Sequence, residues 1–342
     1  MSNQPSIIHL LDDFTLGGVT KSIELFNHPA FARRYRISIE EAYPVWSIAP
    51  QFSNPAIIVV HFSISWKTLP YLYSLASRNS GAQLILVEHS YSREWEQLHV
   101  PDQTRFRSML KLVHKIFDRV ICVSNEQAKW LAEATNLKSP KRHVIYPWSN
   151  MSGLLSIDRP HFSQKDSITI GAYGRFVDDK GFDRLIEAMN KLGAKENIKL
   201  NIGGFGPEEA SLKRLAAYNP NISFYGKVSD IGHYLNQCDI VAIPSRFEAY
   251  GLVATEARYA ARPILVSNVG GLPEQIGEAG ISVDFDDIDA VVRTLRNIRH
   301  LPLVSMSVAG RDDCLRITEQ RITDWIELID TLLGNDGLEA AA

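Results

Sequence analysis

The stretch DIVAIPSRFEAYGLVATEARYAA, residues 239–261, predicts a strand, a turn and the start of a helix. The apolar run up to Pro244 has the length of a buried strand, and the apolar spacing after the turn is helical. Two carboxylates, Glu248 in the turn and Glu256 in the helix, stand with seven residues between them. Acids near a helix N-terminus complement the helix dipole. That accounts for one of the two glutamates, so the pair points to a further role.

Similar apolar runs recur along the whole chain, with helical patterns between them. Continuous runs rich in Ile and Val are typical of strands buried on both faces, so we expect parallel sheets covered by helices. The first half has such runs at residues 6–11, 36–43, 56–62, 82–89, 119–124 and 143–147. The second half has them at residues 167–174, 198–204, 222–226, 240–244, 263–268 and 280–284.

A polar segment without clear periodicity, residues 149–166, lies between the two sets of runs and is predicted to link two domains. The expected fold is α/β, with two Rossmann-like, doubly wound domains at residues 1–150 and 151–318 that face a cleft. Apolar residues at helical spacing predict a last helix in the tail, residues 319–342, ending near Gly334. Ligands of open α/β sheets bind beyond the carboxyl ends of the strands, so the site is expected there.

The overall composition is that of a globular protein, with 342 residues, 45% hydrophobic and 22% charged. The three cysteines form no metal-binding spacing, and their odd number argues against a disulfide framework. No run is long enough to span a bilayer and no secretory signal is present, so a cytoplasmic location is expected. The net charge is −3, but residues 1–150 carry 16 Lys and Arg against 12 Asp and Glu. This offset favours an anionic or membrane-bound partner for the first domain, and no nucleic-acid partner is predicted.

The segment GAYGRFVDDKGFD places Arg175 just beyond a buried strand and Lys180 at a helix start. Two cations beside a helix N-terminus suit an anion with several oxygens, such as a diphosphate. The alternative is that both pair with Asp178, Asp179 or Asp183 as surface salt bridges, which contribute only ~0–1 kcal/mol.

The two glutamates complete this pattern. A carboxylate can accept hydrogen bonds from two adjacent hydroxyls, so Glu248 and Glu256 suit two vicinal diols with an anion between them. A sugar and a ribose joined by a diphosphate have this layout. We therefore predict one glutamate for each sugar ring.

Two glycine clusters also follow strands. Gly17 and Gly18 would let backbone N–H groups approach a phosphate, although an ordinary tight turn explains them equally well. In GGFGPEEA, Gly204 and Gly206 are followed by Glu209 where the dinucleotide fingerprint requires a third glycine, so a dehydrogenase is not predicted.

Five segments of the second domain, GRFVDDKG, GGFGPEE, FYGKVSD, FEAYGLVATEA and VGGLPEQI, resemble in order and spacing those of retaining glycosyltransferases of family four, which have the GT-B fold. The segments LGGVTKS, LVEHS and RVICVSNEQAKWL extend the resemblance over most of the chain. The resemblance implies transfer of a hexose-type sugar from a nucleotide sugar, most often a UDP or GDP sugar, which is a co-substrate and not a cofactor. The implied acceptor is a glycan or lipid-linked saccharide of polysaccharide or glycolipid biosynthesis. Ala261 stands where the family usually has glycine.

Carried over by position, the resemblance assigns the donor diphosphate to Arg175 and Lys180, the nucleotide ribose to Glu256, and hydroxyls of the transferred sugar to Glu248. It brings the first domain's Gly17 and Gly18 toward the diphosphate, and the final helix back onto the first domain. The backbone contacts to phosphate and sugar fall on Ala249, Tyr250, Gly251 and Leu252. The base would lie near Gly204, Gly206, Lys227 and Val228.

The first domain offers two strand-end histidines, His61 and His89, which we expect to emerge side by side. The resemblance favours His89 as a catalytic residue near the donor sugar and its leaving phosphate. His61 is equally explained as a strand-end residue bonded to a loop carbonyl.

Two further expectations concern metal and membrane. The aspartate pairs 12–13, 178–179 and 286–287 are better explained as turn or helix-start acids, so we predict a metal-independent enzyme in which Arg175 and Lys180 stabilise the leaving group. Residues 102–119 form a basic amphipathic segment. Its apolar face either packs on its own sheet or attaches the protein peripherally to the inner face of the membrane.

Two other functions remain open from the residues. A nucleotide-sugar epimerase on the same fold would convert the donor without an acceptor. A non-catalytic sugar-nucleotide-binding module would have no need for all four of Arg175, Lys180, Glu248 and Glu256.

Overall fold

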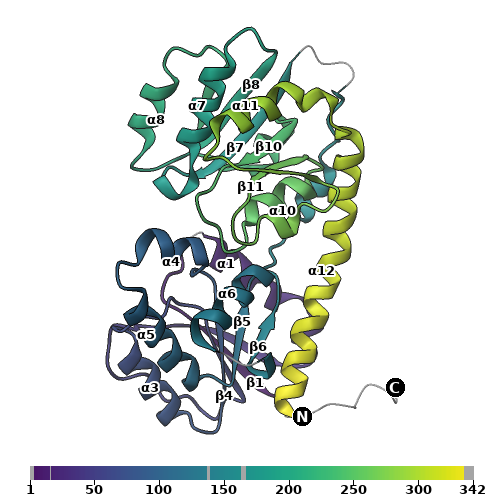
Figure 1. Ribbon diagram of the computed structural model, residues 1–342. Coiled ribbons are helices and arrows are strands. Elements are labelled where there is room, and N and C mark those ends of the chain that lie inside the picture. Colours follow the sequence, from purple (N-terminus) through teal and green to yellow (C-terminus); the bar gives the residue numbers. More distant parts are fainter. Residues whose placement is uncertain (1–3, 16, 137–138, 163–166, 335–342) are drawn as a thin grey trace. The chain divides into compact units, whose positions relative to one another are not determined.

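The computed structural model describes residues 4–15, 17–136, 139–162 and 167–334. The chain divides into two compact units, one made of Met1–Asn150 with Thr318–Ala342 and the other of Met151–Ile317. In each unit the strands of one sheet lie between helices (Figure 1).

The first unit contains a six-stranded parallel sheet in the order β2-β1-β3-β4-β5-β6. Strand β3 is buried along its whole length, and Ile57 to Val60 are at most 1% exposed. The strands are β1 (Ser6–Leu11), β2 (Arg36–Glu41), β3 (Ile57–Val60), β4 (Gln83–Glu88), β5 (Arg119–Cys122) and β6 (Arg142–Val144). The α-helices are α1 (Gly18–Ile23), α2 (Pro29–Ala32), α3 (Leu69–Arg78), α4 (Arg93–His99), α5 (Gln103–Ile116) and α6 (Asn125–Thr135).

The second unit repeats this architecture with the order β12-β11-β10-β7-β8-β9, and its strand pairs are also parallel. The strands are β7 (Ile168–Arg175), β8 (Ile198–Phe205), β9 (Ile222–Gly226), β10 (Ile240–Ile243), β11 (Ile264–Ser267) and β12 (Gly280–Val283). The helices are α7 (Phe182–Leu192), α8 (Glu209–Ala216), α9 (Ile231–Asn236), α10 (Leu252–Tyr259), α11 (Ile288–Asn297) and α12 (Leu303–Leu333).

The predicted α/β fold with two doubly wound parallel sheets is confirmed. Every apolar run that was expected to be a strand contains one, and the bounds differ by a few residues at most. The strands could be predicted because a strand covered by helices on both faces needs an unbroken run of apolar residues. Few other elements as short as a strand need such a run.

Two predicted segments differ from the structure. The predicted linker contains a short 3-10 turn, Ser152–Ser156, and Met151, Leu154 and Ile157 are buried against the core of the second unit. The last helix does not begin near residue 319 but at Leu303, so the boundary between the units falls inside α12.

Ala261, the position where the resemblance implies glycine, has a backbone φ of +53°. This left-handed conformation explains the glycine preference, because a Cβ is disfavoured there. The residue lies in the short connection between the end of α10 at Tyr259 and the start of β11 at Ile264.

Candidate functional site

The predicted donor-binding residues gather at one edge of the second sheet. Strands β10, β7, β8 and β9 are neighbours in that order, and because they are parallel their carboxyl ends share this edge. Arg175 is the last residue of β7, and Gly204 is the penultimate residue of the neighbouring strand β8. Lys227 follows β9 directly. The turn that carries Glu248 follows β10.

Lys180 and Glu248 contact each other directly at this edge. The Lys180 Nζ lies 2.5 Å from Oε2 of Glu248, and the two side chains are 28% and 20% exposed. The Ser245 hydroxyl is a weaker neighbour of the same Oε2 at 3.5 Å. The pairing places an acceptor-only carboxylate and a three-donor ammonium in one spot that solvent can still reach.

The side chain of Arg175 is exposed and has no ion-pair or hydrogen-bond partner among the described residues. The alternative, that Arg175 and Lys180 form surface salt bridges with Asp178 or Asp183, is wrong. Both of these aspartates pair with Arg246 instead. The Arg246 guanidinium donates to the Asp178 carbonyl at 2.5 Å and to both carboxylate oxygens of Asp183 at 2.9 and 2.5 Å. These bonds to Asp183 raise the pKa of Arg246. No local sequence pattern indicates this role for Arg246, because Asp183 lies 63 residues away.

Glycines let the turns at this edge approach one another. Gly181 has φ +62°, and a Cβ there would overlap the carbonyl oxygen of Pro244 at the end of β10. Gly270 has φ +49°, and a Cβ there would overlap the carbonyl oxygen of Glu248. Both backbone conformations favour glycine. The Lys180 and Glu248 turns are therefore held together by backbone packing.

Gly204 and Gly206 also pack on the end of β7. A Cβ at Gly204 would overlap the Gly174 carbonyl, and one at Gly206 would lie 2.5 Å from the Phe176 carbonyl oxygen. Beside them, the Lys227 Nζ lies 5.5 Å from the centroid of the exposed Phe205 ring. Val228 packs against the core of the unit. Of the four residues assigned to the base, Lys227 therefore lies over an exposed aromatic ring, Gly204 and Gly206 pack on the end of β7, and Val228 packs against the core.

Glu256 lies in α10 and is buried, with 4% of its surface exposed. The hydroxyl of Tyr173 in β7 donates to its Oε2 at 2.6 Å. Burial, together with the neighbouring Glu256 carboxylate, raises the pKa of Tyr173 well above its usual value, so Tyr173 stays a donor. Tyr173 was missed in the sequence, where it stands 83 residues from its partner.

The segment from Ala249 to Leu252 leads into α10, with Gly251 at the N-cap in a left-handed conformation, φ +92°. Gln275 supports it by donating through its amide to the carbonyls of Tyr250 at 2.6 Å and Gly251 at 3.0 Å. Thr255 donates to the Gln275 Oε1 at 2.7 Å. These carbonyls are occupied inside the protein, so a ligand at this helix start would meet the N–H groups of the first turn.

Gly17 and Gly18 open α1 in the first unit. Gly17 is the N-cap, and its N–H donates to the Thr20 hydroxyl at 2.9 Å. Its φ of −151° is open to any residue, and a Cβ would meet only Thr15 and Thr20 at van der Waals distance. The fold therefore does not itself demand glycine at position 17.

The expected neighbours His61 and His89 do lie side by side, with His61 Nδ1 and His89 Nε2 3.0 Å apart. His9 in β1 extends the row, with its Nδ1 2.9 Å from His61 Nε2. The loop-carbonyl explanation for His61 is therefore wrong. Burial lowers the pKa of His9 to about 3 and of His89 to about 4, and it lowers that of His61 well below its usual value, so all three are neutral near pH 7.

Glu88, the last residue of β4, precedes His89 and is buried. Its Oε1 accepts from the backbone N–H groups of Ser90 at 3.0 Å and Tyr91 at 3.1 Å. Burial raises the pKa of Glu88 to about 7. The carboxyl group shapes the turn that carries His89, and among the described residues it makes no hydrogen bond to the three histidines.

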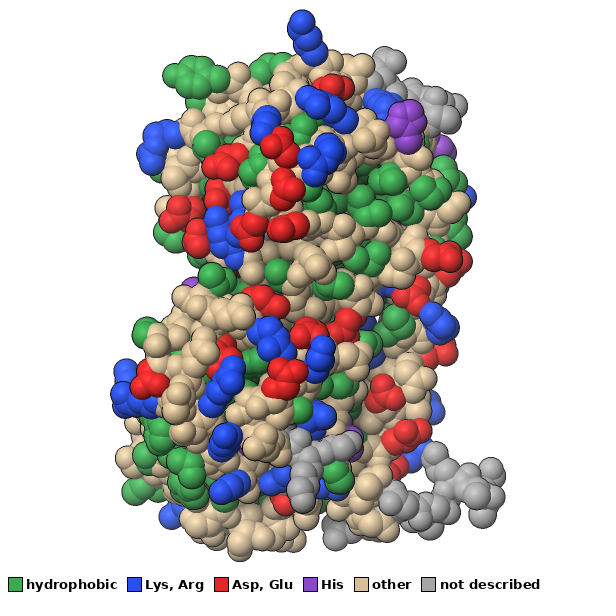
Figure 2. Space-filling model, in the orientation of Figure 1, with side chains coloured by type: hydrophobic (Ala, Val, Ile, Leu, Met, Phe, Trp, Pro, Cys, Tyr) green, Lys and Arg blue, Asp and Glu red, His purple; other side chains and the backbone are tan. Residues whose placement is uncertain are grey.

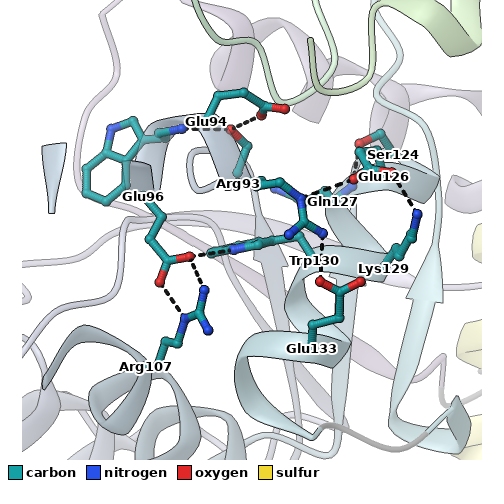
Figure 3. Close-up of polar contacts among 12 residues, drawn as sticks. Arg93, Glu94, Glu96, Arg107, Ser124, Glu126, Gln127, Lys129, Trp130 and Glu133 are labelled. Atoms are coloured by element: carbon teal, nitrogen blue, oxygen red, sulfur yellow. Dashed lines mark hydrogen bonds and ion pairs between the residues drawn. The ribbon is translucent and has the colours of Figure 1, made fainter. Parts of the chain in front are cut away.

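The apolar face of the predicted membrane segment is buried in its own unit. Met109, Leu110 and Val113 of α5 and the following Phe117 belong to the hydrophobic core. Figure 3 shows how the polar side of α5 is held: Arg107 donates to both oxygens of Glu96 in α4, at 2.7 and 2.8 Å, and Trp130 in α6 donates to one of them at 2.9 Å. The apolar face is thus used for packing and is not available to a bilayer.

Charges of both signs share one face of the molecule, and the described residues form neither a metal-ligand cluster nor a membrane-spanning helix. On the face drawn in Figure 2, Lys and Arg side chains are interspersed with Asp and Glu side chains. In the part of the chain that the structure describes, no group of three His, Cys, Asp or Glu residues is placed to hold a metal ion. Within the same residues, no helix has the length and apolar character needed to cross a bilayer. Asp13 and Asp287 act as a turn acid and a helix cap, as expected.

Comparison with known proteins matches each unit to a family model. Residues 16–151 match the model described as Glycosyltransferase Family 4, and residues 156–309 match the model described as Glycosyl transferases group 1. The two models together account for most of the chain.

Three individual proteins illustrate the similarity. An uncharacterized glycosyltransferase of Methanocaldococcus jannaschii is 33% identical over 172 residues, 46% of this chain and 44% of that protein. The capsular polysaccharide biosynthesis glycosyltransferase CapM of Staphylococcus aureus is 28% identical over 196 residues, 52% of this chain and 51% of CapM. The matched region thus spans about half the length of these curated relatives. The solved structure of HepE from Anabaena, in complex with UDP and glucose, has a TM-score of 0.71 at 16% identity and covers 96% of this chain and 100% of HepE. This likeness shows the GT-B fold.

Proposed function

We propose that this chain, which is related to glycosyltransferases along both of its domains, transfers a hexose-type sugar from a nucleoside-diphosphate sugar to a saccharide or lipid-linked acceptor. The observation that carries the proposal is the contact of Lys180 with Glu248 at the carboxyl edge of the second sheet, next to Arg175 without a partner among the described residues. Two cations complement the diphosphate, and the carboxylate complements sugar hydroxyls.

Lys180 has a double task in this proposal. An ammonium has three N–H donors, so it can hold Glu248 in place and still donate to a phosphate oxygen. Arg175 adds a planar fork that suits a second phosphate. As the bond between the sugar C1 and the phosphate oxygen breaks, negative charge grows on the diphosphate, and both cations stabilise it. They supply the electrostatic help that a divalent metal gives elsewhere, so we infer a metal-independent reaction.

The geometry favours Glu248 as a hydroxyl-binding group over a nucleophile. Its Oε2 is already engaged by the Lys180 ammonium at 2.5 Å, which lowers the availability of that oxygen for attack. We infer retention through attack on the same face that the leaving group departs from. In this step a phosphate oxygen of the donor takes the proton of the acceptor hydroxyl while the acceptor oxygen bonds to C1.

Glu256 is assigned to the ribose hydroxyls, with Tyr173 fixing its carboxylate. The base is assigned to the edge formed by Phe205, Gly206 and Lys227, where an exposed aromatic ring can stack on it. HepE, solved with UDP and glucose, supports a UDP sugar as the first donor to test. The name of CapM supports an acceptor from polysaccharide biosynthesis. We infer a cytoplasmic enzyme, since nucleotide sugars are supplied there.

A thermal-shift screen of nucleoside diphosphates and their sugars tests the proposal. A ligand present at ~100 times its dissociation constant adds ~2.7 kcal/mol of stability, which is a clear rise in Tm. Incubating the best donor alone then separates an epimerase, which converts it, from a transferase, which needs an acceptor. If no nucleoside diphosphate or nucleotide sugar stabilises the protein, the proposed function is wrong.

A further inference from the structure

The row His9–His61–His89, called here the histidine chain, crosses three neighbouring strands of the first sheet. Successive ring centroids are 5.2 and 5.3 Å apart, with interplanar angles of 28° and 27°. The nitrogen-to-nitrogen distances of 2.9 and 3.0 Å are those of hydrogen bonds. His9 is completely buried, His61 is 6% exposed, and His89 is partly exposed.

A neutral imidazole has one N–H and one bare nitrogen, so the three tautomers depend on one another. If His9 donates from Nδ1, His61 must accept at Nε2 and donate from Nδ1 to His89. His89 then carries its proton on Nδ1. If the bonds run the other way, His89 donates from Nε2, His61 donates from Nε2, and His9 carries its proton on Nε2. Only these two arrangements satisfy both hydrogen bonds.

The buried end of the histidine chain, at His9, decides between the two tautomer arrangements. The Nε2 of His9 is buried and has no hydrogen-bond partner among the described residues. The second arrangement would bury an N–H there without an acceptor, whereas the first leaves only a bare ring nitrogen. Buried N–H groups without a partner are rare and costly, and unsatisfied acceptors less so. The same isolated nitrogen gives a proton nowhere to go, so the histidine chain does not conduct protons through the domain.

We infer that His9 and His61 are positioning residues that fix His89 in the Nδ1–H tautomer, so that His89 presents a neutral hydrogen-bond donor at the carboxyl edge of the first sheet. The Nδ1 of His89 has no partner among the described residues, and the side chain is partly exposed. A donor of this kind suits a sugar hydroxyl or a phosphate oxygen, not the abstraction of a proton. That role toward the sugar donor rests on the proposed function, whereas the tautomer itself does not.

The tautomer can be measured in the ligand-free protein by long-range ¹H–¹⁵N correlation NMR after ¹⁵N-histidine labelling. His89 is assigned from the signals that disappear in His89→Asn. We expect a protonated Nδ1 and a bare Nε2 for His89. A protonated Nε2, or a mixture of both tautomers, overturns the inference.

A matched pair of variants tests the role of His9. His9→Phe keeps a ring but removes the donor, so the His89 signals should shift to a mixture of tautomers. His9→Asn places an amide N–H close to the former Nδ1 and should restore the parent spectrum. His114→Phe is the control, since His114 is a buried histidine of the same unit that belongs to a different element. Unchanged His89 signals in a folded His9→Phe variant overturn the inference.

His61→Phe is the second variant, in case His9→Phe does not fold. It removes the partner of His89 directly and should give the same mixture. With a working donor, His9→Phe should lower kcat about threefold to tenfold, the size of one neutral hydrogen bond, with KM and nucleoside-diphosphate affinity unchanged. His9→Asn should lie closer to the parent. Absence of transfer with every donor would refute the proposed function and leave the NMR result intact.

Discussion

Removing the charge of Lys180 is expected to lower turnover ~10²–10³-fold, because one donor to the developing charge of the diphosphate is lost. The competing explanation is that Lys180 merely stabilises the turn through its ion pair with Glu248. The pair is close, with Nζ 2.5 Å from Oε2, but the side chains are 28% and 20% exposed. Solvent screens such a pair, so its contribution to the free energy of unfolding is about 1 kcal/mol or less.

A double-mutant cycle of Lys180→Met and Glu248→Gln separates the two explanations. If the pair is only structural, each single variant loses about 1 kcal/mol of stability, and the double variant, which has no unpaired charge, regains part of it with parent-like turnover. If both residues bind the donor, the double variant is at least as impaired as the worse single variant. Urea unfolding and steady-state kinetics give the two readouts.

The matched control is Lys191→Met. Lys191 is another residue of the same unit with an ion pair of similar length, 2.6 Å to Asp289, but with 54% and 59% exposed side chains. We expect parent-like turnover for this variant. A Lys180→Met variant that is folded and works within a few-fold of the parent would refute the reasoning.

The other predictions concern ligands, metals and pH. Glu256→Ala should weaken binding of the nucleoside diphosphate, and Glu248→Ala should chiefly impair use of the full sugar donor; isothermal titration with both ligands checks this, and equal effects on both would contradict it. Turnover should survive excess chelator, and a loss that magnesium or manganese restores would show that a metal takes part. Burial, helped by the charge of Lys141, lowers the pKa of His114 from 6.5 to about 3. The unfolded chain therefore binds a proton that the folded one does not, and stability is lost as the pH falls below 6.5. His114→Leu should remove about 2–3 kcal/mol of that loss between pH 6.5 and 4.5, measured by urea unfolding, and an unchanged pH slope would contradict the assignment.

The sheets could be predicted because each central strand carries its own signal. The run from Ile57 to Val60 is apolar at every position and is buried at every position. The same holds for Ile240 to Ile243 in β10 and for Ile264 to Val266 in β11, because both faces of these strands are buried. The positions of the strand ends also predicted which polar residues lie close together, because the carboxyl ends of parallel strands lie at the same edge of a sheet.

The start of α12 could not be predicted in this way. Its first half contains Gly310 and Asp313, which a sequence pattern assigns to a turn as readily as to a helix. In the structure a Cβ at Gly310 would lie 3.0 Å from Cβ of Ala279, and Asp313 pairs with the buried Arg258. These contacts with distant parts of the second unit favour the helix, and no local pattern records them.

The supporting residues were missed for the same reason. Arg246 and Asp183, Tyr173 and Glu256, and His9 and His61 are 63, 83 and 52 residues apart. Each supporting side chain looks ordinary in its own segment: an arginine in a turn, a tyrosine in a strand and a histidine in a strand. Only the folded structure shows that each of these side chains forms a hydrogen bond with a polar side chain near the carboxyl edge of a sheet.

The two sheet edges differ in charge in a way that fits the proposed transfer. At the second edge solvent reaches the side chains of Arg175, Lys180 and Glu248, so they can contact the diphosphate and the sugar of the donor. At the first edge burial keeps His9, His61 and His89 neutral, and a neutral donor needs no counter-ion when the ligand is absent. A protonated His89 would add attraction for the departing diphosphate, but it would also slow release of the product nucleotide. A neutral donor with a fixed tautomer can orient a hydroxyl or a phosphate oxygen without that penalty, which is why we expect the histidine chain to affect kcat and not nucleotide affinity.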